Sequence, residues 1–222
     1  MLFRSYVKPQ NLDLEKRLDQ LSRARIESFD RDEWLGFLLD EYFVWKYTAP
    51  NRYATTTKAL KDYVSAGMLN DLNATRLSLL TFPPENIKYG LIIALRIPGL
   101  GVAGASGLLS LMYPGHYATV DQFVVLGLRK VNTLNRATAI AKMKPESLGL
   151  NDGVVLIDLL AEKAAELNRI PGFSGWTPRK IDMVLWGCRE LEQNRMRPTS
   201  PWSRLLRDRK STRLNSSHVS ES

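Results

Sequence analysis

The chain is poor in the residues that build covalent or metal-bound frameworks. Its 222 residues include one cysteine, Cys188, and two histidines, His116 and His218. A single cysteine excludes an intramolecular disulfide framework, an all-cysteine metal centre and an iron–sulfur cluster held by one chain. This cysteine usage fits a reducing compartment, so we expect a cytoplasmic protein without a bound metal.

Long apolar runs are also missing. No run reaches the roughly 18 residues that a membrane-crossing helix needs, and residues 1–10 lack the apolar core of a secretory signal. We therefore predict no transmembrane helix and no membrane partner. Apolar residues still make up 44% of the chain, which is enough for a sizeable core.

The charge balance is basic. Lysine and arginine number 31 against 23 acidic residues, a formal net charge of +8, and such a balance favours polyanionic partners. The polar segment Lys210–Ser222 has no helical period, and we interpret it as a translated sequencing-adapter remnant. It carries two basic residues and one acidic residue, so the basic excess survives without it.

Helical periodicity runs through nearly the whole chain, and no alternating strand pattern exceeds about five residues. Leucines in residues 11–29 share one amphipathic face, Asp30 and Glu33 form a capping box, and Pro178 opens a strong last helix. We predict an all-α bundle of about eight to ten helices. It forms one domain over residues 1–206, followed by a disordered tail at 207–222.

A rigid corner separates two apolar helices at residues 97–101, which read "IPGLG". Gly99 and Gly101 permit backbone angles that side chains forbid, and Pro98 stiffens the entry. The next helix starts near Val102, so its free N–H groups and the positive end of its dipole can receive an anion such as a DNA phosphate. A corner that serves packing alone is the alternative.

The 30-residue segment "LRIPGLGVAGASGLLSLMYPGHYATVDQFV" resembles the signature of the helix-hairpin-helix DNA glycosylases, the superfamily of endonuclease III and 8-oxoguanine glycosylase. Its corner matches their Leu-Pro-Gly-Val-Gly pattern, and Val120-Asp121 follows at their spacing. Two softer likenesses, "WKYTAPNR" and "TPRKIDMVLW", point to an uncharacterised bacterial branch. The resemblance implies DNA contacts by the corner and the helix start: Pro98, Gly99, Leu100, Gly101, Val102 and Ala103.

The same resemblance gives Asp121 the role of catalytic acid, which stabilises the developing sugar cation or orients a water molecule. An ordinary helix N-cap is the alternative reading. Bifunctional relatives carry a lysine where this chain has Ala103, so the resemblance implies a monofunctional base-excision-repair glycosylase without β-lyase activity by the usual route. A monovalent ion bound by corner carbonyls stays open. No other cofactor is expected.

Further candidates surround this segment. Lys46 and Arg52 flank a helix end beside Trp45, where basic and aromatic side chains can grip phosphate and stack a flipped base. The alternatives are a solvated helix end and, for Lys46, a displaced amine nucleophile. His116 lies in a loop where it can contact phosphate, although loop histidines are commonly incidental. Asp182 in "TPRKIDMVLW" is interpreted as scaffold.

The small-residue run "AGASG" at 103–107 favours close helix packing, with room for an extruded base as the alternative. Two functions from different classes therefore stay open. One is a monomeric DNA N-glycosylase that acts on damaged or mispaired bases in duplex DNA. The other is a non-catalytic helix-hairpin-helix module that binds DNA or a protein. An Asp121 carboxylate open to a base favours the enzyme, and one sealed by backbone favours the module.

Overall fold

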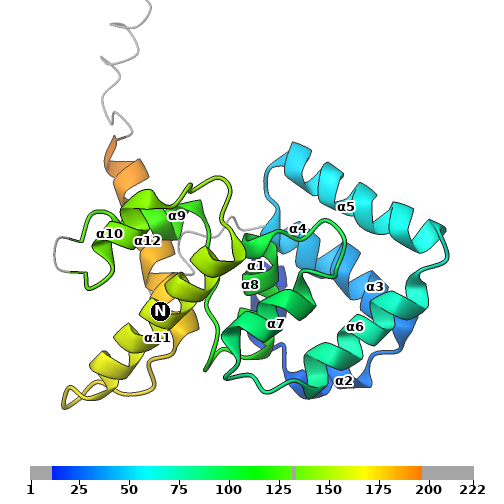
Figure 1. Cartoon of the computed structure of the whole chain (residues 1–222), viewed down its shortest axis with the longest axis horizontal. Coiled ribbons are helices and arrows are strands. Elements are labelled where there is room, and N and C mark those ends of the chain that lie inside the picture. Colours follow the sequence, from blue (N-terminus) through cyan, green and yellow to red (C-terminus); the bar gives the residue numbers. More distant parts are fainter. Residues whose placement is uncertain (1–11, 132–133, 197–222) are drawn as a thin grey trace, which may run out of the picture. The chain divides into compact units, whose positions relative to one another are not determined.

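The computed structural model describes residues 12–131 and 134–196, and within these ranges it contains helices and turns but no strand (Figure 1). The predicted all-α class is confirmed. The helices are α1 (Leu12–Asp19), α2 (Arg23–Ser28), α3 (Arg31–Gly36), η3 (Phe37–Tyr42), α4 (Phe43–Lys46), α5 (Pro50–Ser65), α6 (Leu69–Thr81), α7 (Ile87–Ala94), α8 (Val102–Met112), α9 (Gln122–Leu128), α10 (Ala137–Lys142), α11 (Leu150–Asn168) and α12 (Pro178–Met196).

The contacts divide the chain into two units, Met1–Gly187 and Cys188–Ser222. The first unit holds the apolar core and every side chain discussed below. Of the second unit, only the helical backbone up to Met196 and the exposed Cys188 are described. The predicted tail at 207–222 and His218 lie outside the described residues.

The first amphipathic stretch is two helices rather than one. Leu14, Leu18 and Leu21 are buried as their spacing predicts, but the chain turns after α1. Ser22 restarts the helix, because its hydroxyl accepts the backbone N–H of Arg25 at 3.2 Å. A local side-chain cap thus decides where the second helix begins.

The next segment carries an unusual helical form. Asp30 and Glu33 form the predicted capping box at the start of α3, and the helix then widens into the π-helical segment η3 before α4. The wider turn places neighbouring residues together in the core, and both Tyr42 and Phe43 are fully buried. Such π segments recur at functional sites, and this one directly precedes α4, whose last residue is Lys46.

Helix α8 lies at the centre of the core and is buried along almost its whole length. It packs against α7 and α11. The approach of α11 is close, because a Cβ added at Gly153 would lie 2.6 Å from Val102 Cγ1. On α8 itself, Gly104 and Gly107 allow equally close packing. A Cβ at either position would meet side chains of residues 42–47.

Local caps and a proline mark the boundaries of the C-terminal helices. Asp121 caps α9, and the Thr177 hydroxyl accepts the Lys180 N–H at 3.2 Å at the start of α12. Helix α11 ends at Asn168, shortly before Pro171. None of the described helices is both long and apolar enough to cross a bilayer.

Candidate functional site

The turn between α7 and α8, residues 95–101, lies at the surface. Gly99 and Gly101 are exposed, whereas Leu100 and Val102 are buried and anchor the turn to the core. Gly99 has φ +85°, which favours glycine, and its missing side chain admits the backbone of Thr56 on α5. The turn is therefore both accessible and fixed.

The start of α8 has the features that an anion site needs. Gly101 is the N-cap and supplies no side-chain acceptor, and the first described intrahelical bond runs from the Ala105 N–H to the Gly101 carbonyl at 2.8 Å. The N–H groups of the first helical turn point outward at the positive end of the helix dipole. Pro98 and Ala103 are partly exposed on either side.

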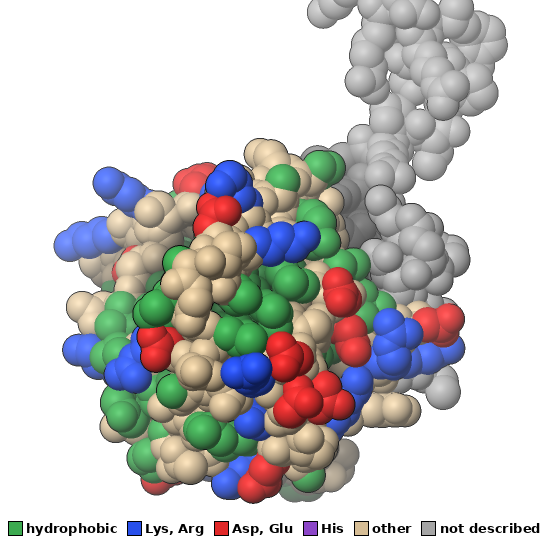
Figure 2. Space-filling model, turned by 90° about the vertical axis from the view of Figure 1, so that its right-hand side faces the viewer, with side chains coloured by type: hydrophobic (Ala, Val, Ile, Leu, Met, Phe, Trp, Pro, Cys, Tyr) green, Lys and Arg blue, Asp and Glu red, His purple; other side chains and the backbone are tan. Residues whose placement is uncertain are grey.

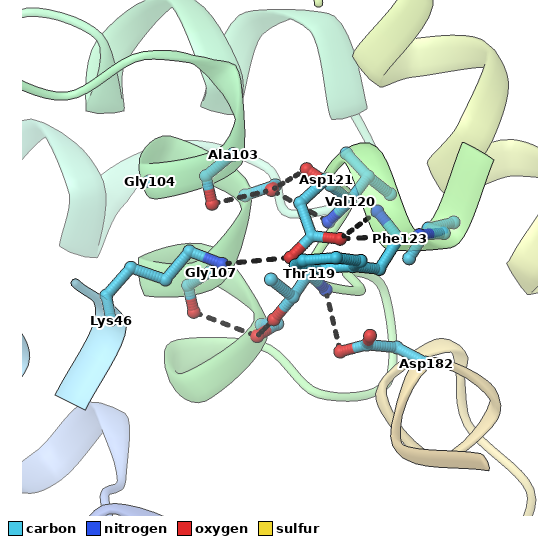
Figure 3. A network of polar contacts seen from close by, with 12 residues as sticks. Lys46, Ala103, Gly104, Gly107, Thr119, Val120, Asp121, Phe123 and Asp182 are labelled. Carbon is cyan, nitrogen blue, oxygen red and sulfur yellow. Dashed lines mark hydrogen bonds and ion pairs between the residues drawn. The ribbon is translucent and has the colours of Figure 1, made fainter. Parts of the chain in front are cut away.

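Asp121 combines a cap with an ion pair. Its Oδ1 accepts the backbone N–H groups of Phe123 at 2.9 Å and Val124 at 3.3 Å. Its Oδ2 lies 3.7 Å from Lys46 Nζ (Figure 3). One oxygen is thus held by backbone and the other faces a cation, while the side chain keeps 25% of its surface exposed.

Two serines of α8 hold the Asp121 segment in place. The Ser106 hydroxyl accepts the Val120 N–H at 3.0 Å, and the Ser110 and Thr119 hydroxyls are 3.1 Å apart. Thr119 lies beside Ser110 and Val120 beside Ser106, so the segment before Asp121 runs antiparallel to α8, toward the α7–α8 turn. Since Ser106 lies roughly 7 Å along the helix axis from the N-cap, the carboxylate and the turn are tied to one rigid element.

Asp182 adds a second carboxyl group on the far side of the segment. Its Oδ2 accepts the Thr119 N–H at 3.3 Å (Figure 3). The pKa of Asp182 is raised to about 7, chiefly by burial and in smaller part by the charge of Asp121, while the cation of Lys46 opposes this rise. The Thr119 bond and Arg179 also lower this pKa. With this pKa, Asp182 changes its protonation state near neutral pH, and its charge interacts with that of Asp121.

Arg179 on α12 links the site to α1 and to Trp45. Its guanidinium donates to the Ser110 hydroxyl at 3.3 Å, pairs with Asp19 at 3.0 Å and lies over the Trp45 ring at 5.9 Å. The Trp45 indole in turn donates to Glu15 at 2.5 Å. The Trp45 side chain thus belongs to a polar network inside the fold and is not free to stack on an exposed base.

The glycines of α8 allow tyrosine side chains to pack directly against the helix backbone. A Cβ at Gly104 would lie 2.3 Å from Tyr47 Oη, and one at Gly107 would lie 2.8 Å from Tyr42 Oη. Tyr42 donates a hydrogen bond to the Gly104 carbonyl. Close packing, the favoured reading of "AGASG", is what these residues provide, and aromatic side chains occupy the space that the alternative assigned to an extruded base.

The remaining predicted residues are not all brought together. Arg52 is exposed in the first turn of α5, and its charge lowers the pKa of Tyr47, which burial raises to about 12. His116 is exposed beyond the C-terminal end of α8. Because that helix is about 16 Å long, His116 and the α7–α8 turn do not share one phosphate.

Net charge alone does not locate a nucleic-acid surface. Figure 2 shows the side of the molecule on which α5 and α6 lie in Figure 1, and there acidic side chains are interspersed with basic ones. Among the residues that the structure describes, no three His, Cys, Asp or Glu side chains gather in a way that would hold a metal ion.

Comparison of the chain with protein-family models, with curated proteins and with solved structures finds no match. The function of this chain therefore has to be inferred from the geometry of the site.

Proposed function

We propose that this protein is a DNA N-glycosylase, in which the α7–α8 turn is a helix-hairpin-helix that binds duplex DNA and Asp121 is the catalytic carboxylate. The observation that carries the proposal is the partly exposed Asp121 side chain, fixed to the same helix whose uncapped N-terminus is at the surface. A phosphate held by the N–H groups at the start of α8 positions the strand, and a flipped nucleotide brings its sugar to Asp121.

The chemistry needs one carboxylate and one water molecule. The bond between C1′ and the base nitrogen breaks, and its electron pair leaves with the base. The cation that develops on the sugar is stabilised by Asp121 Oδ2, and water then attacks C1′ and transfers a proton to that oxygen. The backbone bonds to Oδ1 and the Lys46 ion pair keep Asp121 in one orientation, so little reorganisation accompanies the reaction.

Excision from duplexes that carry single oxidised, alkylated or deaminated bases tests this proposal. We expect the wild-type protein to leave an alkali-labile abasic site in at least one duplex, and Asp121→Asn to reduce the rate by about 10²–10³-fold, the usual effect of losing such a group. Asparagine caps helices as well as aspartate does, so this variant keeps the fold. Duplex binding of both proteins serves as the control.

The non-catalytic module remains the second candidate, because Tyr42, Tyr47 and Lys46 fill the space over the small residues of α8. It predicts salt-sensitive duplex binding with no abasic site formed from any lesion. That combination of results would overturn the enzymatic proposal and leave the binding role.

A further inference from the structure

The segment that follows Asp121 is basic in a way that the chain as a whole is not. Residues 122–145 contain five basic residues and no acidic one, whereas the full chain has 31 basic and 23 acidic residues. This stretch forms α9 and α10, which contact each other (Figure 1). We call its described part, residues 122–131 and 134–145, the basic lobe. Its basic residues are Arg129, Lys130, Arg136, Lys142 and Lys144.

Arg129 fixes the two helices of the basic lobe to each other. Its guanidinium donates hydrogen bonds to the backbone carbonyls of Ile140 at 3.3 Å and Met143 at 2.7 Å. The side chains of Ile140 and Met143 are buried in the core. Lys142 and Lys144, which flank Met143 in the chain, are exposed. The two lysines are therefore held at the surface by a rigid base at the end of α9.

Local structure does not account for Lys142 and Lys144. Cations near the end of a helix commonly stabilise its last carbonyl groups, but at α10 Arg129 already bonds them. Another common role is ion pairing, which in this lobe is performed by Arg136 with Glu162 on α11. The side chains of Lys142 and Lys144 have no hydrogen bond or ion pair with any residue that the structure describes. Both ammonium groups are therefore available to an external anion.

The place of the basic lobe in the fold favours a phosphate backbone as that anion. Asp121 is the N-cap of α9, so Arg129 at the other end lies about 12 Å further along the helix axis. Phosphates of one DNA strand follow each other by about 3.4 Å along the duplex. A strand that passes Asp121 in the direction of α9 therefore brings to the lobe the phosphates that are about three to four nucleotides from the flipped one.

We propose that the basic lobe is a second DNA contact, in which Lys142 and Lys144 bind phosphates of the strand that passes Asp121. The inference rests on the proposed function, because that function places a nucleotide at Asp121. Lysine binds phosphate as a point charge, so this contact is independent of base sequence and adds affinity without selecting the lesion. It extends the DNA-binding surface to a part of the chain that is separate in sequence from the α7–α8 turn.

Binding of the full-length protein to an undamaged duplex over a range of salt concentrations tests this contact. The lobe variant Lys142→Gln/Lys144→Gln should reduce the slope of log affinity against log salt concentration by about 1.8, because each lost phosphate contact removes about 0.9. At about 0.1 M salt its affinity should be about tenfold lower. Lys142→Arg/Lys144→Arg keeps both charges and should bind as the wild type does. The matched control is Lys16→Gln/Lys163→Gln, which removes the same charge from α1 and α11, where each lysine is already paired with an acidic residue.

Acylation of lysines in the wild-type protein, with and without duplex, locates the contact without any substitution. Protection of Lys142 and Lys144 by DNA, with Lys163 unprotected, supports the inference. Equal salt slopes for the wild type and the lobe variant, or the same loss of affinity in the control variant, overturn it. A lobe variant that loses affinity for polyglutamate but not for DNA also overturns it, and assigns the lobe to an acidic protein.

Base excision measured on the same proteins separates the lobe contact from the proposed glycosylase. Excision by the wild type, together with unchanged duplex affinity of the lobe variant, overturns the lobe contact and leaves the glycosylase standing. Weaker duplex binding by the lobe variant of a protein that excises no base supports the lobe contact and overturns the glycosylase. Absence of duplex binding by the wild type overturns both.

Discussion

Substitution of Gly104 by alanine tests the packing that brings the η3–α4 segment onto α8. In an otherwise unhindered helix interior this change stabilises a protein by about 1 kcal/mol, because alanine has the higher helix propensity. At Gly104 the added carbon would lie 2.3 Å from Tyr47 Oη and 2.8 Å from Leu100 Cδ2. Ordinary contacts between such atoms are about 3.5–4.0 Å, so the Tyr47 ring has to move by more than about 1 Å.

Displacing Tyr47 has a calculable cost. Overpacking of this kind typically destabilises a protein by about 1–3 kcal/mol. The Tyr47 hydroxyl also bonds the Thr56 side chain in an enclosed position, and the loss of such a bond costs about 1 kcal/mol. After the helix-propensity gain is subtracted, we expect Gly104→Ala to lower the free energy of unfolding by about 1–3 kcal/mol.

Gly36→Ala is the matched control. Gly36 has helical angles, φ −57° and ψ −47°, and a Cβ there would meet nothing within 4 Å. This variant should be more stable than the wild type by about 0.5–1 kcal/mol. Urea unfolding at equal m-values measures both differences. Equal or greater stability of Gly104→Ala would refute the contact between Tyr47 and α8.

Two further predictions concern charge at the site. The pKa of Asp182 is about 7 in the folded protein, compared with an ordinary value of 3.8. Between these two values the folded state binds more protons than the unfolded state. The free energy of unfolding therefore falls as the pH rises from about 4 to 7, by up to about 4 kcal/mol. Asp182→Asn cannot titrate, and its urea midpoints should change less than those of the wild type across that window; parallel pH profiles would contradict the assignment. At Gly101, which has extended angles and open space, Asp and Asn should both cap α8, but Gly101→Asp should bind duplex DNA about tenfold more weakly at low salt than Gly101→Asn. Equal affinities of these two variants would contradict the prediction that a DNA phosphate binds at the start of α8.

Much of the fold follows from local signals. Helical periodicity predicted the all-α class, and both the capping box of Asp30 and the helix start at Pro178 are where the sequence indicated. Local signals also have limits. Pro83 and Pro84 are compatible with a helix start, yet α7 begins at Ile87, because the Asn86 side chain accepts the Tyr89 N–H. Caps of this kind act within four residues, so a sequence with several candidate caps does not by itself show which one begins the helix.

The candidate site was only half predictable from sequence. Asp121 stands out because it follows the corner at a suggestive spacing and precedes an apolar helix. Nothing near Lys46 indicates its partner, and Asp182 reads as part of an amphipathic helix. The glycines at 104 and 107 indicate that another segment packs closely against α8, but they do not show which side chains make the contact.

Sequence by itself determined the helical class, the glycine turn and the cap at Asp121, because each depends on backbone angles and hydrogen bonds within a few residues. Only the tertiary structure decided that Lys46 faces Asp121 and that the charge of Asp182 interacts with both of them. These groups come from segments far apart in the chain. Their meeting depends on how the η3–α4 segment and α12 pack around α8, which follows from side-chain shapes and not from local pattern.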